Sequence, residues 1–237
     1  MKLLLLSSSR AHNSAYLAPN LALIQQHLQG IDKILFIPYA AVSLSYDAYQ
    51  QMVQQAFEAI GIEVDSIHHH PNKGAAVQQA KAIVVGGGNT FVLLQLLYQQ
   101  GLVDEITQQV AKGVPYLGWS AGSNIAGLSI RTTNDMPIIE PPSFNALNLL
   151  PCQLNPHYSD YKPEGFHGET RDMRLAEFML LNPTTPIIGL AEGTALLRSG
   201  DVLSYQGDVD GYLFIGGSKT AILPGADLSA LLHPSTT

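Results

Sequence analysis

Short apolar runs alternate with longer segments of helical spacing through the first half of this 237-residue chain. The runs are nearly continuous in Leu, Ile and Val, which is typical of strands that are buried on both faces of a sheet. Alternation of this kind predicts βαβ units, and therefore an α/β fold with a doubly wound, mostly parallel sheet. The predicted strands are 2–7, 33–38, 62–67, 81–85 and 115–119, and the predicted helices include 15–28, 46–60, 90–98 and 103–112.

The spacing changes after Arg131. Residues 131–168 are rich in Pro, Asn and Gly and predict long loops, which are usually functional in a compact domain. A helix is predicted at 169–180, and the short runs after it are separated by Gly and Asp, which predicts C-terminal β-hairpins. Because no linker or internal repeat interrupts the chain, we expect a single domain of residues 1–237. The short runs of the expected hairpins are 187–191, 195–198, 202–205 and 212–215.

Composition bears on which partners the chain can bind and on the compartment in which it is found. The formal net charge is −7 and there is no run of Lys or Arg, so the basic patch that a nucleic-acid partner requires is not visible. No stretch approaches the roughly 20 apolar residues of a membrane span, and the apolar run within residues 1–9 is too short for a signal peptide. The single cysteine, Cys152, cannot form an internal disulfide, which suits a reducing compartment. We therefore expect a cytoplasmic protein that binds neither nucleic acid nor membrane.

Residues 118–122 read Gly-Trp-Ser-Ala-Gly and match the G-x-S-x-G nucleophile elbow. In this motif a serine stands on a tight strand-to-helix turn, where small neighbours allow the turn to close. The pattern alone is weak in a chain with 21 glycines, but here a predicted strand precedes it and a segment able to form a helix, 121–128, follows it. We therefore predict that Ser120 is a nucleophile whose helix presents free N–H groups to an oxyanion.

A second glycine-rich segment, residues 86–90, reads Gly-Gly-Gly-Asn-Thr and lies between a predicted strand and a predicted helix. Ligands of doubly wound sheets bind beyond the carboxyl ends of the strands, and glycines let backbone N–H groups approach a ligand closely. The segment is interpreted as an oxyanion donor, as a phosphate cradle, or as a tight strand-to-helix turn. The full G-x-G-x-x-G and Walker patterns, which would favour phosphate, are both missing from it.

A serine nucleophile needs a general base, which is usually histidine. Of the eight histidines, His157 follows an Asn-Pro pair in the long-loop region beyond the elbow, where the proline can restrict the backbone and aim the ring. His167 is the competing candidate. The run His68-His69-His70 suggests metal binding, but three consecutive histidines before a proline lack ligand spacing, which favours a solvated turn. We therefore predict His157 as the base and no metal ligand.

Two carboxylates compete to orient the histidine. Glu192 ends a predicted apolar strand and precedes a glycine, which is a favoured place for a site residue. Asp135 lies in the Pro-rich and Asn-rich segment after Arg131, where it is also suited to cap a turn. The residues alone leave both open.

These motifs together resemble peptidase E, the aspartyl dipeptidase family of serine peptidases. The resemblance implies a cytoplasmic enzyme that hydrolyses dipeptides with N-terminal aspartate and uses no metal or other cofactor. It implies Ser120 as nucleophile, His157 as base, Glu192 as the favoured triad acid and Asp135 as a further site residue, on a glutamine-amidotransferase-like fold. The segments that carry it are 84–91 (VVGGGNTF), 118–122 (GWSAG), 131–137 (RTTNDMP), 155–157 (NPH) and 168–171 (GETR).

The implied chemistry is acyl transfer through an acyl-enzyme. We expect the backbone N–H groups of Gly88 and Ala121 to form the oxyanion hole, where a lost donor costs roughly 10²–10³ in rate. An acidic chain repels an aspartyl substrate unless a cation lies in the pocket, and Arg171 suits a carboxylate because its planar fork binds both oxygens. Asn89 is assigned with Arg171 to substrate binding. Two alternatives remain, a cyanophycinase-like hydrolase of β-aspartyl-arginine and a non-enzymatic small-molecule sensor, and neither the oligomeric state nor the residue after aspartate is predicted.

Overall fold

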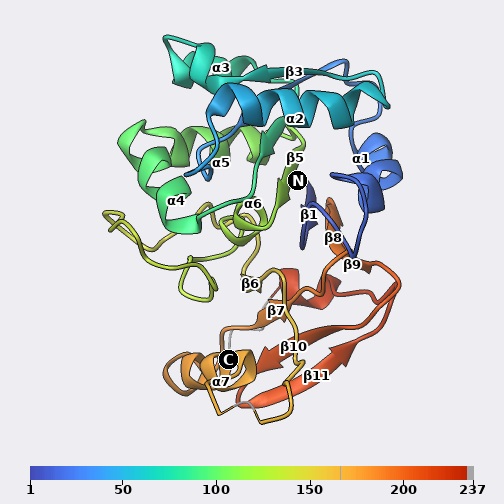
Figure 1. The fold of residues 1–237 in the computed structure, drawn as a ribbon, viewed down its shortest axis with the longest axis vertical. Coiled ribbons are helices and arrows are strands. Elements are labelled where there is room, and N and C mark those ends of the chain that lie inside the picture. Colours follow the sequence, from blue (N-terminus) through green and yellow to red (C-terminus); the bar gives the residue numbers. More distant parts are fainter. Residues whose placement is uncertain (166, 234–237) are drawn as a thin grey trace.

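The computed structural model describes residues 1–165 and 167–233, which form two β-sheets with helices packed against them (Figure 1). The large sheet has seven strands in the order β3-β2-β4-β5-β1-β8-β9. The first five are mutually parallel, and β8 and β9 are antiparallel to their neighbours. The strands are β1 (Lys2–Leu6), β2 (Lys33–Ile37), β3 (Glu63–Ser66), β4 (Ile83–Val85), β5 (Tyr116–Trp119), β8 (Ala195–Ser199) and β9 (Val202–Gln206).

Helices cover both faces of the large sheet, as the alternation of the sequence predicts. Along β1, Leu3 and Leu5 belong to one apolar core and Leu4 and Leu6 to another, because successive side chains of a strand point to opposite faces. The first core contains residues of α3, α4 and α5, and the second contains residues of α1 and α2. The doubly wound, mostly parallel α/β fold is therefore confirmed. The helices are α1 (Leu21–His27), α2 (Tyr46–Glu58), α3 (Lys73–Gln79), α4 (Thr90–Gln99), α5 (Leu102–Ala111), α6 (Ala121–Asn124) and α7 (Arg171–Leu181).

The second sheet lies below the large one in Figure 1 and has the order β11-β10-β7-β6. Its strands pack with α7 around Tyr158, Leu175, Met179, Ile187 and Phe214. The hairpin β8–β9 matches the expected runs 195–198 and 202–205, whereas in the hairpin β10–β11 only β10 corresponds to an expected run, 212–215. The strands of this sheet are β6 (Gln153–Asn155), β7 (Ile187–Gly189), β10 (Gly211–Ile215) and β11 (Ser218–Ile222).

Several predicted boundaries were wrong for local physical reasons. The helix after the elbow ends at Asn124 rather than residue 128, because the Leu128 N–H donates to the Cys152 carbonyl instead of continuing the helix. The helix predicted at 15–28 begins only after Pro19, where a short 3₁₀ turn precedes α1, since proline suits a first turn but not an interior. Three elements were not predicted: α3, β11, and β6 within the expected loops.

The helices are short. The longest described one, α2, has 13 residues and buries Tyr49, Val53 and Phe57 against the sheet. Within residues 1–165 and 167–233, none combines the length and apolarity that crossing a bilayer requires.

Candidate active site

The predicted elbow is a strained turn between β5 and α6. Ser120 follows the last residue of β5 and has φ 53° and ψ −116°, a conformation that costs a non-glycine residue about 1–3 kcal/mol. The two flanking glycines allow the turn to close. A Cβ on Gly118 would lie 2.4 Å from the Gly122 carbonyl oxygen, and one on Gly122 would lie 2.2 Å from the Val85 carbonyl oxygen. Both glycines of the motif are therefore required for steric reasons, as the sequence suggested.

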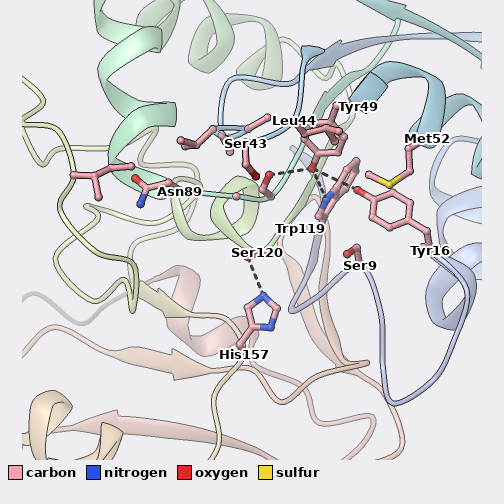
Figure 2. A pocket seen from close by; sticks show the side chains of 16 residues that line it. Ser9, Tyr16, Ser43, Leu44, Tyr49, Met52, Asn89, Trp119, Ser120 and His157 are labelled. Carbon is pink, nitrogen blue, oxygen red and sulfur yellow. Dashed lines mark hydrogen bonds between the residues drawn. The ribbon is translucent and has the colours of Figure 1, made fainter. Parts of the chain in front are cut away.

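Ser120, His157 and Glu192 lie in series. The Ser120 hydroxyl is 2.9 Å from Nε2 of His157 (Figure 2). Nδ1 of the same ring is 2.8 Å from Oε1 of Glu192. Because a carboxylate can only accept, the Nδ1–H donates to Glu192, which leaves Nε2 free to accept the serine proton. The arrangement places a base next to the hydroxyl and a carboxylate behind the base. The His157 and Glu192 side chains are 37% and 56% exposed, so solvent reaches the pair.

Backbone contacts hold His157 in an unusual conformation. Its φ is 54°, in the left-handed region that bulky residues rarely adopt. Its N–H donates to the hydroxyl of Ser7, and that hydroxyl donates to the Leu190 carbonyl. Its carbonyl accepts from the guanidinium of Arg171. Ser7 was missed by sequence reasoning, although its place directly after β1 is the kind of strand-end position that marks sites in this fold.

Asp135 lies near the series formed by Ser120, His157 and Glu192 but has different hydrogen-bond partners. One of its carboxylate oxygens accepts from the Thr90 N–H at 2.7 Å and from the Thr90 hydroxyl at 2.5 Å. The carboxylate hydrogen-bonded to His157 is that of Glu192. The geometry thus separates the two candidate acids, placing Asp135 at the N-terminus of α4.

Of the two proposed oxyanion donors, Gly88 lines one cavity together with Ser120, and Ala121 directly follows the serine and lines another. Among the described residues, neither the Gly88 N–H nor the Ala121 N–H has a backbone partner. Gly88 has φ 138°, and a Cβ there would lie 2.2 Å from the Ala40 carbonyl oxygen, so this position requires glycine. Gly87 packs directly against the serine, since a Cβ on it would lie 2.9 Å from the Ser120 Cβ. Gly88 and Ala121 each line a cavity that also includes Ser120.

Two cavities meet at Ser120 and His157. The first has a volume of about 550 Å³ and is walled mainly by apolar and aromatic groups, including Tyr16, Tyr49, Met52 and Trp119 (Figure 2). Tyr49 organises this wall, because its hydroxyl donates to the Gly87 carbonyl and accepts from the Trp119 indole N–H at 3.2 Å. Burial raises the pKa of Tyr49, so the phenol stays protonated. The sequence did not single out these aromatic residues.

The second cavity, of about 380 Å³, is polar and charged. It is lined by Asp135, Arg171 and Glu192 together with Thr90 and Asn134. Arg171 is the first residue of α7, capped by Thr170. Burial, and next the nearby charge of Arg174, lower the pKa of Arg171, yet a guanidinium stays protonated in proteins. Two carboxylates and one fixed cation therefore face a single small space.

Two other predicted residues have more restricted places. Asn89 lines the first cavity, but its amide caps α4 by accepting from the Val92 N–H and donates to the Met136 carbonyl. His167, the competing base, is exposed in the segment before α7. Of the described histidines, His157 is the one hydrogen-bonded to Ser120.

A serine, a histidine and a carboxylate in series on a strand-to-helix elbow define an α/β serine hydrolase. The signature of Peptidase family S51 matches residues 3–205. A peptidase E of Shewanella baltica (strain OS195) is 54% identical over 233 residues, which cover 98% of each chain. A peptidase E of Shewanella denitrificans is 55% identical over 230 residues, covering 97% of this chain and 98% of the relative. The chain therefore belongs to peptidase family S51.

Solved structures agree with the fold. A peptidase from an acI-B1 actinobacterium superposes with a TM-score of 0.69 at 20% identity, over 96% of each chain. A candidate peptidase E from Listeria monocytogenes EGD-e gives a TM-score of 0.63 at 24% identity, over 86% of this chain and 97% of the other. At this identity the likeness concerns the fold.

Proposed function

We propose that this chain is a serine dipeptidase that removes N-terminal aspartate from Asp-Xaa dipeptides through an acyl-enzyme. The observation that carries the proposal is the hydrogen-bonded series from Ser120 through His157 to Glu192 at the junction of the two cavities. Membership of family S51 and the high identity to proteins named peptidase E support the peptidase assignment. The same findings do not favour a cyanophycinase-like hydrolase or a sensor.

Charge complementarity supports aspartate in the second cavity. An N-terminal aspartyl residue carries an ammonium and a side-chain carboxylate, and the cavity offers Asp135 and Arg171 as partners of opposite sign. Glu192 remains for His157, whose ring becomes positive during the reaction. In this pose Arg171 binds the aspartate side chain and Asp135 binds the ammonium. A fixed cation is needed because the chain has a formal net charge of −7.

The proposed reaction has two halves. His157 takes the proton of Ser120 as the hydroxyl oxygen attacks the aspartyl carbonyl carbon, and the N–H groups of Gly88 and Ala121 stabilise the oxyanion. The C–N bond then breaks, and His157 gives its proton to the leaving amine, leaving an ester on Ser120. Water, activated by the same histidine, hydrolyses the ester and releases free aspartate. The leaving residue occupies the first cavity.

The decisive experiment is release of free aspartate from Asp-Leu by the purified chain, with the folded Ser120→Ala variant as control. Asn-Leu and β-aspartyl-arginine serve as comparison substrates. Hydrolysis of Asp-Leu well above both is the expected result. Preference for β-aspartyl-arginine would favour the cyanophycinase-like alternative, and binding of aspartyl ligands without any turnover would favour a sensor.

A further inference from the structure

Two of the three consecutive histidines take part in a cluster that the proposed reaction does not use. His68 and His69 belong to the 3₁₀ helix Ile67–His69 that follows β3, and Asp47 and Gln50 lie on the first two turns of α2. The Nε2 atom of His68 is 2.9 Å from Oδ1 of Asp47, and the Nε2 atom of His69 is 3.4 Å from that same oxygen. The ligand atoms of these three residues all lie within 4.8 Å of one another.

A buried hydroxyl group contacts the far side of the His68 ring. Ser66 is fully buried, and its hydroxyl oxygen lies 2.7 Å from Nδ1 of His68 and 3.4 Å from the Phe36 carbonyl oxygen. The hydroxyl can accept from Nδ1–H of His68, and in that tautomer Nε2 carries a lone pair on the side of the Asp47 carboxylate, as metal ligation requires.

Gln50 adds a fourth acceptor. Its amide nitrogen donates to the Val64 carbonyl at 2.9 Å, which sets the orientation of the amide group. The amide oxygen consequently faces Nε2 of His69, also at 2.9 Å. Two imidazole nitrogens, one carboxylate oxygen and one amide oxygen thus converge from two elements that are separate in the sequence.

We propose that Asp47, His68 and His69 bind a divalent transition-metal ion, with Zn²⁺ as the representative ion and the Gln50 amide oxygen as the adjacent fourth ligand. Zinc accepts imidazole and carboxylate ligands in tetrahedral geometry, and bonds of about 2.0–2.2 Å put neighbouring ligand atoms roughly 3.3 Å apart. The separations of 2.9 and 3.4 Å are close to that edge length. Ser66 plays the supporting role that a hydrogen bond to the other ring nitrogen has in many metal sites.

Helix α2 would connect the proposed metal site to the first cavity. Tyr49 and Met52 of the same helix turns line the first cavity beside Ser120. An ion held by Asp47 and the two histidines would tie the start of α2 to the 3₁₀ helix after β3. None of Asp47, His68 and His69 lines either cavity beside Ser120, so the proposal does not depend on the reaction and does not place the metal in it.

Calorimetric titration of the untagged full-length chain, stripped with chelator, against ZnCl₂ tests the proposal. We expect one ion per chain, and at least tenfold weaker binding in Asp47→Ala and in His68→Ala. Ser66→Ala should weaken binding by about tenfold, within the range known for supporting hydrogen bonds. The matched control is His70→Ala, because His70 belongs to the same run but its ring nitrogen lies 3.0 Å from Asp65 instead; its affinity should stay within twofold of wild type.

A second readout separates ligand loss from misfolding. Wild type and His70→Ala should gain thermal stability with zinc, and bound Co²⁺ should give the strong visible absorption of a tetrahedral site. Asp47→Ala should show neither effect while keeping its metal-free melting temperature, since the Asp47 side chain is 77% exposed. No zinc binding by wild type, or equal losses in His68→Ala and His70→Ala, would overturn the proposal and leave a hydrogen-bonded histidine cluster only.

Discussion

The two cavities beside Ser120 differ in the kind of selectivity that each can impose. The polar cavity contains two carboxylates and a guanidinium, whereas the described lining of the apolar cavity holds no lysine, arginine, aspartate or glutamate. A substrate that leaves a buried charge unpaired is strongly disfavoured, but one that leaves part of an apolar cavity unfilled loses only about 1–3 kcal/mol per methylene. The first residue of the substrate should therefore be selected strictly and the second loosely.

Removing the group that both cavities share should have the largest effect. Ser120→Ala should lower kcat by roughly 10⁴-fold or more, because the nucleophile is lost while the binding surfaces remain. Circular dichroism should be unchanged, and the affinity for Asp-Leu should stay within a few-fold of wild type. Near-normal turnover by a folded variant would contradict the assignment. Ser120→Cys should retain some activity, since thiolates are good nucleophiles.

The two carboxylates of the polar cavity should respond differently. Glu192→Gln should lower kcat by about a hundredfold or more, because glutamine cannot stabilise the imidazolium by charge; loss of a buried triad carboxylate costs roughly 10⁴. The smaller value is expected because the Glu192 side chain is 56% exposed. Asp135→Asn should act mainly on KM if Asp135 binds the ammonium. Steady-state kinetics of both variants with Asp-Leu decide this, and a larger fall of kcat in Asp135→Asn would reverse the assignment.

The cation of the polar cavity should set the preference for aspartate. Arg171→Ala should lower kcat/KM for Asp-Leu by at least ~2 kcal/mol, or roughly thirtyfold, because the substrate carboxylate loses its partner. Arg171 also donates to the carbonyls of Pro156 and His157. Part of the loss in kcat/KM therefore comes from a less firmly positioned His157.

The Asp-Leu to Asn-Leu ratio separates these two contributions. Loss of the ion pair shrinks this ratio, whereas displacement of His157 lowers kcat/KM equally for both substrates. Arg131→Ala is the matched control, because Arg131 is exposed and lies over the ring of Phe144. Equal falls for both dipeptides in Arg171→Ala would make Arg171 structural, and a smaller Asp-Leu to Asn-Leu ratio in Arg131→Ala would then make Arg131 the next candidate.

A substitution in the apolar cavity should have the smallest effect on kcat/KM. Met52→Ala should lower kcat/KM for Asp-Leu by roughly three- to tenfold, because a partly buried apolar contact to the leaving residue is lost. Asp-Ala, which is too small to reach the cavity wall, should be hydrolysed at the wild-type rate. Met173→Ala is the control, since that methionine is 55% exposed on α7. A larger effect on Asp-Ala than on Asp-Leu would show that the leaving residue lies elsewhere.

Sequence was sufficient wherever the evidence is local. The alternation of apolar runs and helical segments predicts the doubly wound sheet, because a strand or helix needs only its own periodicity to be recognised. The elbow can be read in five residues, since the clash that requires Gly118 and Gly122 arises within one turn and its strand neighbour. His157 could be favoured over His167 from its Asn-Pro context, and the family resemblance pointed the same way.

Tertiary structure decided what depends on residues far apart in the chain. Ser7 contacts the backbone of His157 across 150 positions, and Asp47 approaches His68 across 21. The residues around Asp135 and Glu192 do not tell which carboxylate reaches the His157 ring. That contact depends on how β6 and β7 bring the loops after them together. The contacts of His68 and His69 cannot be read from the histidine run either, because their hydrogen-bond partners Asp47 and Gln50 lie on α2. Local spacing determines elements and turns, whereas hydrogen-bond partners depend on the packing of elements, which has no short-range signature in the chain.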